Sequence, residues 1–242
     1  SLLFVVFYPS LLLYSSLALR DTLVLMFMMM SVIFFLENRR LLAVLISLPL
    51  LVIKFQNFFL MIVFFVAHLY FSRDSIIYRF RYIFAIVILA SLAPFLLSII
   101  EILDQSRLNM YIDDGGYRGA YEHIRTIEDF VIIAIKSAPY FLMKPLPWEA
   151  DSFLTFLQSF ENIFVFIFLG YMLIQTSKFD RQIAFKWFIY LFAALSIYGL
   201  VVYNFGTAVR YKFPFIVIVI VGMAYELYLK HGNLILNKST KL

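Results

Sequence analysis

The sequence predicts an all-α protein, a polytopic transmembrane helical bundle of about eight spans with one long external loop that carries short helices. Hydrophobic residues make up 64% of the chain and charged residues 14%, whereas soluble proteins are roughly half apolar and a quarter charged. Apolar runs recur along the chain, and none shows the sustained alternation of a membrane β-barrel. Because lipid offers the backbone no hydrogen-bond partner, these runs are expected to be helices.

Eight hydrophobic segments are separated by charged or polar breaks. They are Leu2–Leu19, Thr22–Leu36, Leu41–Ile53, Phe58–Phe71, Tyr82–Leu103, Phe153–Ile174, Ile183–Tyr203 and Phe213–Leu229. The second to fourth segments are shorter than the ~20 residues of an untilted span. Each could be a re-entrant helix, could span a locally thinned bilayer, or could extend through its flanking charged residues by snorkelling. The chain begins at Ser1 directly in an apolar run, and we expect it to be a fragment that lacks N-terminal spans. We treat 1–242 as a single transmembrane domain.

Lysine and arginine set the expected orientation. If the segments alternate, one side collects most of the basic residues of the short loops and the tail: Arg39, Arg40, Arg73, Arg79, Arg81, Lys178, Arg181, Lys186, Lys230, Lys238 and Lys241. By the positive-inside rule this side is cytoplasmic, and the long loop, residues 104–151, faces the periplasm or the exterior. Arg20, Lys54, Arg210 and Lys212 then lie at outer turns, where basic residues are normally scarce.

The long loop gathers candidate chemical groups. Arg118 and Arg125 are seven residues apart, which places them on one face if the segment is helical, and together they could clamp a diphosphate. Glu122 and His123 offer an acid or a base beside them. A solvated amphipathic helix whose charges pair locally accounts for the same residues.

An apolar stretch, Phe130–Met143, follows within this loop and contains Lys136 and Pro139. It predicts an amphipathic interfacial helix or a re-entrant dip, rather than a ninth span, with Tyr140 and Trp148 at headgroup depth.

Two outer turns carry cations beside polar groups. Arg20-Asp21 joins the first two segments, and Asn204–Lys212, which contains Arg210, joins the last two. Cations at a water–lipid boundary suit a lipid diphosphate, whose charged head must be matched where its tail enters the bilayer. Solvated turns, and a snorkelling lysine at Lys54, are the simpler alternatives. The chain has no cysteine and only scattered histidines, so no metal site is predicted.

Three groups of residues resemble bacterial multi-pass O-antigen and exopolysaccharide polymerase-like proteins, and the similarity runs over nearly the whole chain. The groups are Tyr8-Pro9-Ser10 with Ser15-Ser16-Leu17-Ala18-Leu19-Arg20-Asp21, Pro145-Leu146-Pro147-Trp148-Glu149 followed by Glu161-Asn162, and Asn204-Phe205-Gly206-Thr207 with Arg210-Tyr211-Lys212. Family members usually have more spans. The resemblance implies a metal-independent, cofactor-free glycosyltransferase of the bacterial inner (plasma) membrane that joins undecaprenyl-diphosphate-linked oligosaccharide units in cell-surface polysaccharide synthesis.

The resemblance also implies roles for residues. Arginines would hold the departing lipid diphosphate, and the candidates are Arg20, Arg118, Arg125 and Arg210. Glu122 or His123 would assist the acceptor hydroxyl. The aromatic residues that could stack on sugar rings are Tyr117, Tyr121 and Trp148. The expected partners are the lipid-linked oligosaccharide, membrane lipids and envelope-assembly proteins, with no nucleic acid.

Two other functions remain open. One is a transporter or flippase of the same lipid-linked units, which would form no bond and would be expected to show charged or broken-helix sites at mid-membrane. The other is a non-catalytic membrane subunit of an envelope complex.

Overall fold

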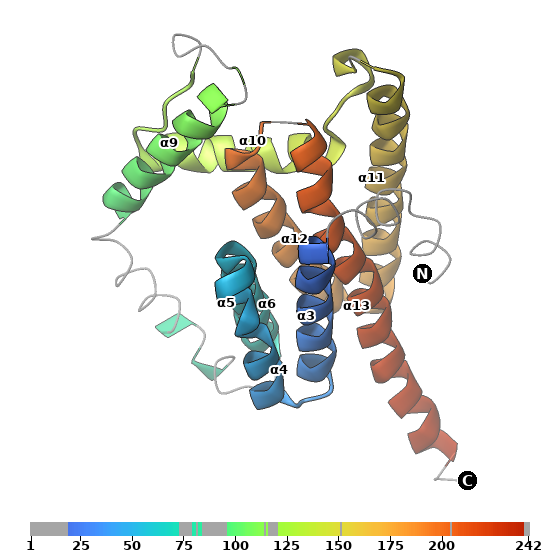
Figure 1. Ribbon diagram of the computed structural model, residues 1–242. Helices are drawn as coiled ribbons and strands as arrows, with labels where there is room; N and C mark the ends of the chain where they lie inside the picture. The colour runs from blue at the N-terminus through green and yellow to red at the C-terminus, as the bar shows by residue number, and fades with distance from the viewer. Residues whose placement is uncertain are drawn as a thin grey trace. The chain divides into compact units, whose positions relative to one another are not determined.

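The computed structural model describes residues 19–72, 79–80, 82–83, 96–113, 115, 121–150, 152–203 and 205–239, and these residues contain helices and no strand (Figure 1). The helices are α3 (Leu19–Leu36), α4 (Arg40–Ser47), α5 (Pro49–Ile53), α6 (Phe55–Phe71), α9 (Leu96–Asp113), α10 (Ile127–Met143), the 3-10 turn η3 (Pro147–Glu149), α11 (Phe153–Phe179), α12 (Arg181–Val201) and α13 (Phe205–Ser239).

Of the described helices, three are long and apolar enough to cross a membrane: α11, α12 and residues Gly206–Lys230 of α13. This fits a helical membrane protein, but the described residues do not contain the eight spans expected. Pro49 divides the segment Leu41–Ile53 into α4 and α5 because its ring cannot continue the preceding helix. The predicted spans Leu2–Leu19 and Tyr82–Leu103 lie mostly outside the described residues.

The chain forms two compact units. The first comprises Ser1–Phe65, Phe164–Leu191 and Phe213–Leu242, and the second comprises Val66–Ile163 and Phe192–Lys212. Both units therefore contain parts of α6, α11, α12 and α13, and α9 and α10 belong to the second unit.

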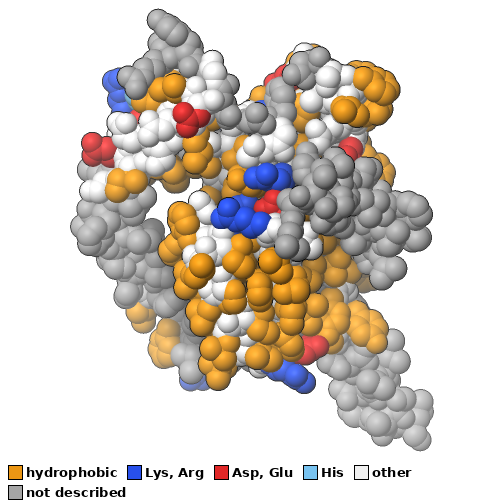
Figure 2. Space-filling model, viewed as in Figure 1, with side chains coloured by type: hydrophobic (Ala, Val, Ile, Leu, Met, Phe, Trp, Pro, Cys, Tyr) orange, Lys and Arg blue, Asp and Glu red, His pale blue; other side chains and the backbone are white. Residues whose placement is uncertain are grey.

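In the first unit, α3 and α4 form a helical hairpin that turns at Asn38, whose φ is 64°. The Ser31 hydroxyl donates a hydrogen bond to the Ala43 carbonyl at 2.7 Å and joins the two helices. The outer surface of this hairpin and of α5 is apolar, with Leu41 75% and Val52 91% exposed, and Figure 2 shows hydrophobic side chains covering it. An apolar surface of this kind is suited to lipid contact.

The core of the first unit is built around Trp187, which is wholly buried. Its indole N–H donates to Glu226 Oε2 at 2.8 Å, and the other carboxylate oxygen accepts from Lys186. The indole ring lies against the Phe64 ring, with 5.2 Å between the centroids. On α13, Gly222 leaves space for the indole, because a Cβ at this position would lie 2.3 Å from the Trp187 Cη2 atom.

In the second unit, α10 runs across the carboxyl-terminal end of α12 (Figure 1). The contact depends on Gly199, where a Cβ would lie 2.8 Å from the Ser137 carbonyl oxygen. Beside it, Ile100, Ile124 and Leu200 form a buried apolar cluster. α9, the segment before α10 and the last turn of α12 are thereby packed together.

Two buried lysines hold the carboxyl-terminal end of α10. Lys212 Nζ donates to the Leu142 and Lys144 carbonyls at 2.9 and 2.7 Å, and Lys144 Nζ donates to the Tyr203 carbonyl. The Asn162 side-chain amide also donates to the Lys144 carbonyl, at 2.9 Å. A helix leaves its last carbonyls unpaired, so these donors satisfy them and join α10 to α11 and α13. Lys212, which was predicted to lie at an outer turn, thus has a structural role.

Candidate functional site

A polar cluster of the long loop begins on α9. Asp104 and Arg107 are three residues apart, so they share one face of this helix, and both are buried. Their side chains contact the segment 121–125, which is not helical and leads to the first residue of α10. The prediction ended the apolar segment at Leu103 and began the external loop at residue 104, whereas helix α9 continues to Asp113.

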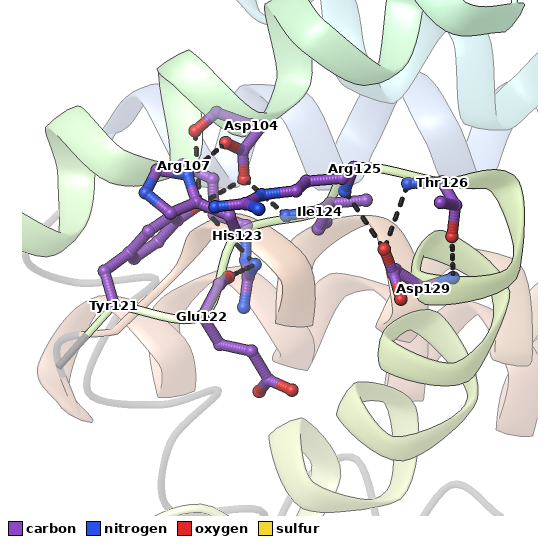
Figure 3. Close-up of polar contacts among 9 residues, drawn as sticks. All are labelled: Asp104, Arg107, Tyr121, Glu122, His123, Ile124, Arg125, Thr126 and Asp129. Carbon is purple, nitrogen blue, oxygen red and sulfur yellow. Dashed lines mark hydrogen bonds and ion pairs between the residues drawn. The ribbon is translucent and has the colours of Figure 1, made fainter.

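Asp104 is held by three donors from the segment 121–125 (Figure 3). One carboxylate oxygen accepts from the Tyr121 hydroxyl and from the Ile124 backbone N–H, each at 2.9 Å. The other lies 2.8 Å from His123 Nδ1. Burial disfavours the charged form, but the hydrogen bonds from Ile124, His123 and Tyr121 outweigh it and hold the pKa of Asp104 below its ordinary value.

The ionised Asp104 fixes the orientation of the imidazole. A carboxylate can only accept, so His123 Nδ1 carries the proton and donates it. In the neutral ring, Nε2 therefore carries the lone pair. This nitrogen is accessible to a substrate because the His123 side chain is 40% exposed. This is the arrangement that general-base catalysis requires, in which a carboxylate orients an imidazole whose other nitrogen is accessible.

Arg107 fixes this cluster to the end of α12. Its Nε donates to the Leu200 carbonyl at 3.0 Å, and its Nη1 donates to the Glu122 carbonyl at 2.8 Å. The guanidinium also lies 5.2 Å from the centre of the Tyr121 ring. Because Leu200 lies in the last turn of α12, Arg107 satisfies a helix-end carbonyl and holds the segment 121–125 against the same point.

The predicted pair of candidate bases is separated by the structure. His123 points into the cluster, whereas the exposed Glu122 side chain points away from Asp104 (Figure 3). Tyr121 lies in the cluster, but the residue is only 9% exposed and its ring packs against Tyr111 and His123. These contacts join Tyr121 to α9, and the predicted stacking of its ring on a sugar stays a prediction.

Trp148, the other described aromatic candidate, lies in η3 and is 79% exposed. Its neighbour Glu149 is fixed by the Tyr140 hydroxyl at 2.8 Å and by the Leu146 N–H at 3.0 Å. The Trp148 ring is therefore presented on a constrained turn. Tyr117 lies outside the described residues.

Arg118 and Arg125 were predicted to share one face of a helix, but Arg125 does not lie in a helix. This residue lies in the non-helical segment directly before Thr126. Thr126 caps α10, because its side-chain hydroxyl oxygen accepts a hydrogen bond from the Asp129 N–H at 3.0 Å. Asp129 in turn accepts from the backbone N–H of Thr126 at 3.0 Å, and this reciprocal cap begins the helix at Ile127. Arg125 is exposed and follows His123 by two residues, while Arg118 lies outside the described residues.

The two remaining predicted arginines belong to different units. In the first unit, Arg20 is exposed and its Nε donates to the Ile53 carbonyl at 3.1 Å, at the end of α5. Beside it, Lys54 Nζ lies 3.9 Å from Asp21 Oδ1 in an ion pair. In the second unit, Arg210 lies over the Tyr211 ring, 5.1 Å from its centre. The predicted convergence of Arg20, Arg125 and Arg210 on one substrate stays a prediction.

Sequence reasoning missed Asp104 and Arg107. The available signal was their spacing of three residues at the end of an apolar run, between Leu103 and Leu108, which is the pattern of a helix that continues with one polar face. Within the described ranges there is no group of three or more histidine, cysteine or acidic side chains placed to hold a metal ion.

Acid is expected to destabilise the second unit through Asp104. Its pKa is lower in the folded protein than in the unfolded chain, so its contribution to the free energy of unfolding is complete above about pH 5 and is lost as the pH falls through the folded pKa. The midpoint of thermal unfolding in detergent, measured against pH, should therefore fall less steeply for Asp104→Asn than for the wild type below about pH 4. Parallel curves would contradict the assigned hydrogen bonds.

Comparison of the chain with protein-family models, with curated proteins and with solved structures gave no match.

Proposed function

We propose that this chain is a membrane glycosyltransferase of the polysaccharide polymerase type, which joins lipid-diphosphate-linked oligosaccharide units in the bacterial inner membrane. The observation that carries the proposal is the pair Asp104–His123, an oriented imidazole with an accessible Nε2. It supplies the base that the transfer of a sugar to a hydroxyl group requires. The apolar helices α11 to α13 supply the membrane setting for a lipid-linked substrate.

The proposed step is an inverting displacement. The acceptor hydroxyl oxygen attacks the anomeric carbon of the donor sugar, and the bond between that carbon and the lipid diphosphate oxygen breaks. The proton of the hydroxyl passes to His123 Nε2, and the lipid diphosphate leaves with the electron pair of the broken bond. Asp104 stays ionised throughout and stabilises the imidazolium that forms.

The leaving group needs positive charge. Arg125 is the cation nearest to His123 in the sequence; its side chain is exposed, and its charge also acts on the Asp129 carboxylate. It is the first candidate to bind the diphosphate, because a guanidinium can bind two phosphate oxygens at once. Arg20, Arg118 and Arg210 are the further candidates.

The test is the product made by the purified full chain in lipid vesicles supplied with lipid-linked oligosaccharide. A transferase makes longer lipid-linked chains. Movement of the unit across the bilayer without longer chains would replace the proposal with a transporter or flippase. If neither occurs while the protein remains folded, the non-catalytic subunit is favoured and the proposal is wrong.

A further inference from the structure

The outer face of α10 is apolar beyond its first turn, in which the exposed Glu128 lies on the same side. Val131, Ile132 and Ile135 are 46%, 42% and 54% exposed, and Pro139 is exposed on the same side of the helix. On the opposite face, Phe141 is buried within the second unit. A helix that packs on a protein with one face and meets water with the other should be polar on its outer face, and α10 is not.

The length and charge of α10 exclude a bilayer crossing. It has 17 residues, with Glu128 and Asp129 in its first turn. Lys136 lies at its middle and is exposed. A span needs about 20 predominantly apolar residues, so α10 has too few, and its apolar face is suited to lying along a lipid surface.

The contact with α12 indicates the depth of α10. α12 is long and apolar enough to cross a membrane and ends at Val201. The contact with α10 is at Gly199, two residues before that end. α10 therefore lies at the level where α12 leaves the hydrocarbon, and Figure 1 shows it running across this end.

Trp148 extends the same surface. It is 79% exposed on the turn η3, and Glu149 beside it accepts from the Tyr140 hydroxyl, so this turn is fixed to α10. Exposed tryptophan is unfavourable in water but is enriched at the headgroup level of membranes, where its ring and its N–H are both accommodated.

We propose that the outer face of α10 and Trp148 lie in the headgroup–acyl boundary of the bilayer, and that they hold His123 at headgroup level. His123 is coupled to this depth because Ile124 packs on Leu200 and Arg107 donates to the Leu200 carbonyl, one residue before the end of α12. The proposal concerns the lipid contact and its depth, and it stands whether or not the chain forms a glycosidic bond.

The experiment uses Trp148 as a fluorescent reporter. The chain has two tryptophans, and Trp187 is buried, so Trp187→Phe leaves Trp148 alone. The full-length variant is placed in vesicles of phosphatidylcholine and phosphatidylglycerol that contain lipids brominated either near the headgroup or deep in the acyl chain. The shallow bromines should quench most strongly, corresponding to a depth of about 5–10 Å below the boundary, and aqueous iodide should quench weakly.

Charged residues on the outer face of α10 should move Trp148 out of the lipid boundary toward water. Ile132→Asp combined with Ile135→Asp is expected to reduce quenching by shallow bromines and to increase quenching by iodide. Lys136→Asp is the matched control, because it places the same carboxylate at an adjacent, already polar position, and it should leave the quenching profile unchanged.

Two results would overturn the proposal. Strong quenching by iodide with no effect of any brominated lipid would place Trp148 in water, and strongest quenching by the deep bromines would place it inside the hydrocarbon. If Trp187→Phe does not fold, the difference between the wild type and Trp148→Phe gives the same profile, since Trp187 is common to both.

Discussion

Replacement of His123 by alanine is expected to lower the rate of sugar transfer by a factor of about 10² to 10⁴, the usual contribution of a positioned general base. The substitution removes the only group of the cluster that combines an accessible lone pair with an orienting carboxylate. Since the side chain is 40% exposed, the protein should still fold. The rate is measured as longer lipid-linked product per unit time with the purified protein.

Glu122→Gln is the matched control for His123→Ala. Glu122 is the adjacent residue and the other predicted base, but its side chain points away from the cluster, and only its backbone carbonyl contacts Arg107 (Figure 3). This variant should retain a transfer rate close to that of the wild type. Loss of activity in Glu122→Gln with normal activity in His123→Ala would reverse the assignment.

Gly222→Ala is expected to be the most destabilising small substitution in the first unit. The new Cβ would lie 2.3 Å from the Trp187 Cη2 atom, far inside van der Waals contact. The indole cannot easily swing away, because it is wholly buried and its N–H is bonded to Glu226. We expect a loss of about 1–3 kcal/mol or more in the free energy of unfolding, measured by denaturant unfolding in mixed micelles.

Two variants test the steric cause. Gly170→Ala, in the apolar helix α11, adds the same methyl group where no atom lies within 4 Å, and should leave the free energy of unfolding nearly unchanged. Trp187→Phe removes the part of the ring that meets the new Cβ, so in that background Gly222→Ala should cost less than in the wild type. Equal costs in the two backgrounds would show that the Trp187 contact is not the cause.

Hydropathy was sufficient to predict the long apolar helices. The segment Phe153–Ile174 was expected and α11 is Phe153–Phe179, which adds the mostly polar residues Gln175–Phe179 at its end. The break at Lys54 was also predicted correctly, since α5 ends at Ile53 and α6 begins at Phe55. Apolar side chains and a polar interruption are local properties, so the sequence reveals them directly.

The number of spans could not be obtained in the same way. Apolar composition marked Leu41–Ile53 as one segment, which is already shorter than the ~20 residues of a span, and Pro49 divides it further into α4 and α5. A hydropathy average does not register that a proline interrupts the backbone hydrogen bonds of a helix. The backbone consequence has to be considered separately, through the missing N–H and the fixed φ.

The candidate site was predicted in part. His123 was singled out from its residue type and neighbours, but Asp104 lies 19 residues earlier and was assigned to the beginning of a loop. Their contact is a tertiary one between α9 and the segment before α10. Spacing rules for helices and strands predict only which residues share a face of the same element, so they could not predict this contact. Arg107 was hidden for the same reason, because its partner Leu200 is 93 residues away.

Release of lipid diphosphate by the purified protein is the measurement that bears most closely on the proposed reaction centre, the Asp104–His123 pair. Asp104→Asn keeps the shape of the side chain but removes the charge that orients His123, so release should fall by about 10²-fold or more. Asp113→Asn makes the same chemical change at an exposed position of the same helix α9, and should release lipid diphosphate at the wild-type rate. Equal rates of lipid diphosphate release by Asp104→Asn and the wild type would show that the Asp104–His123 pair is not the reaction centre.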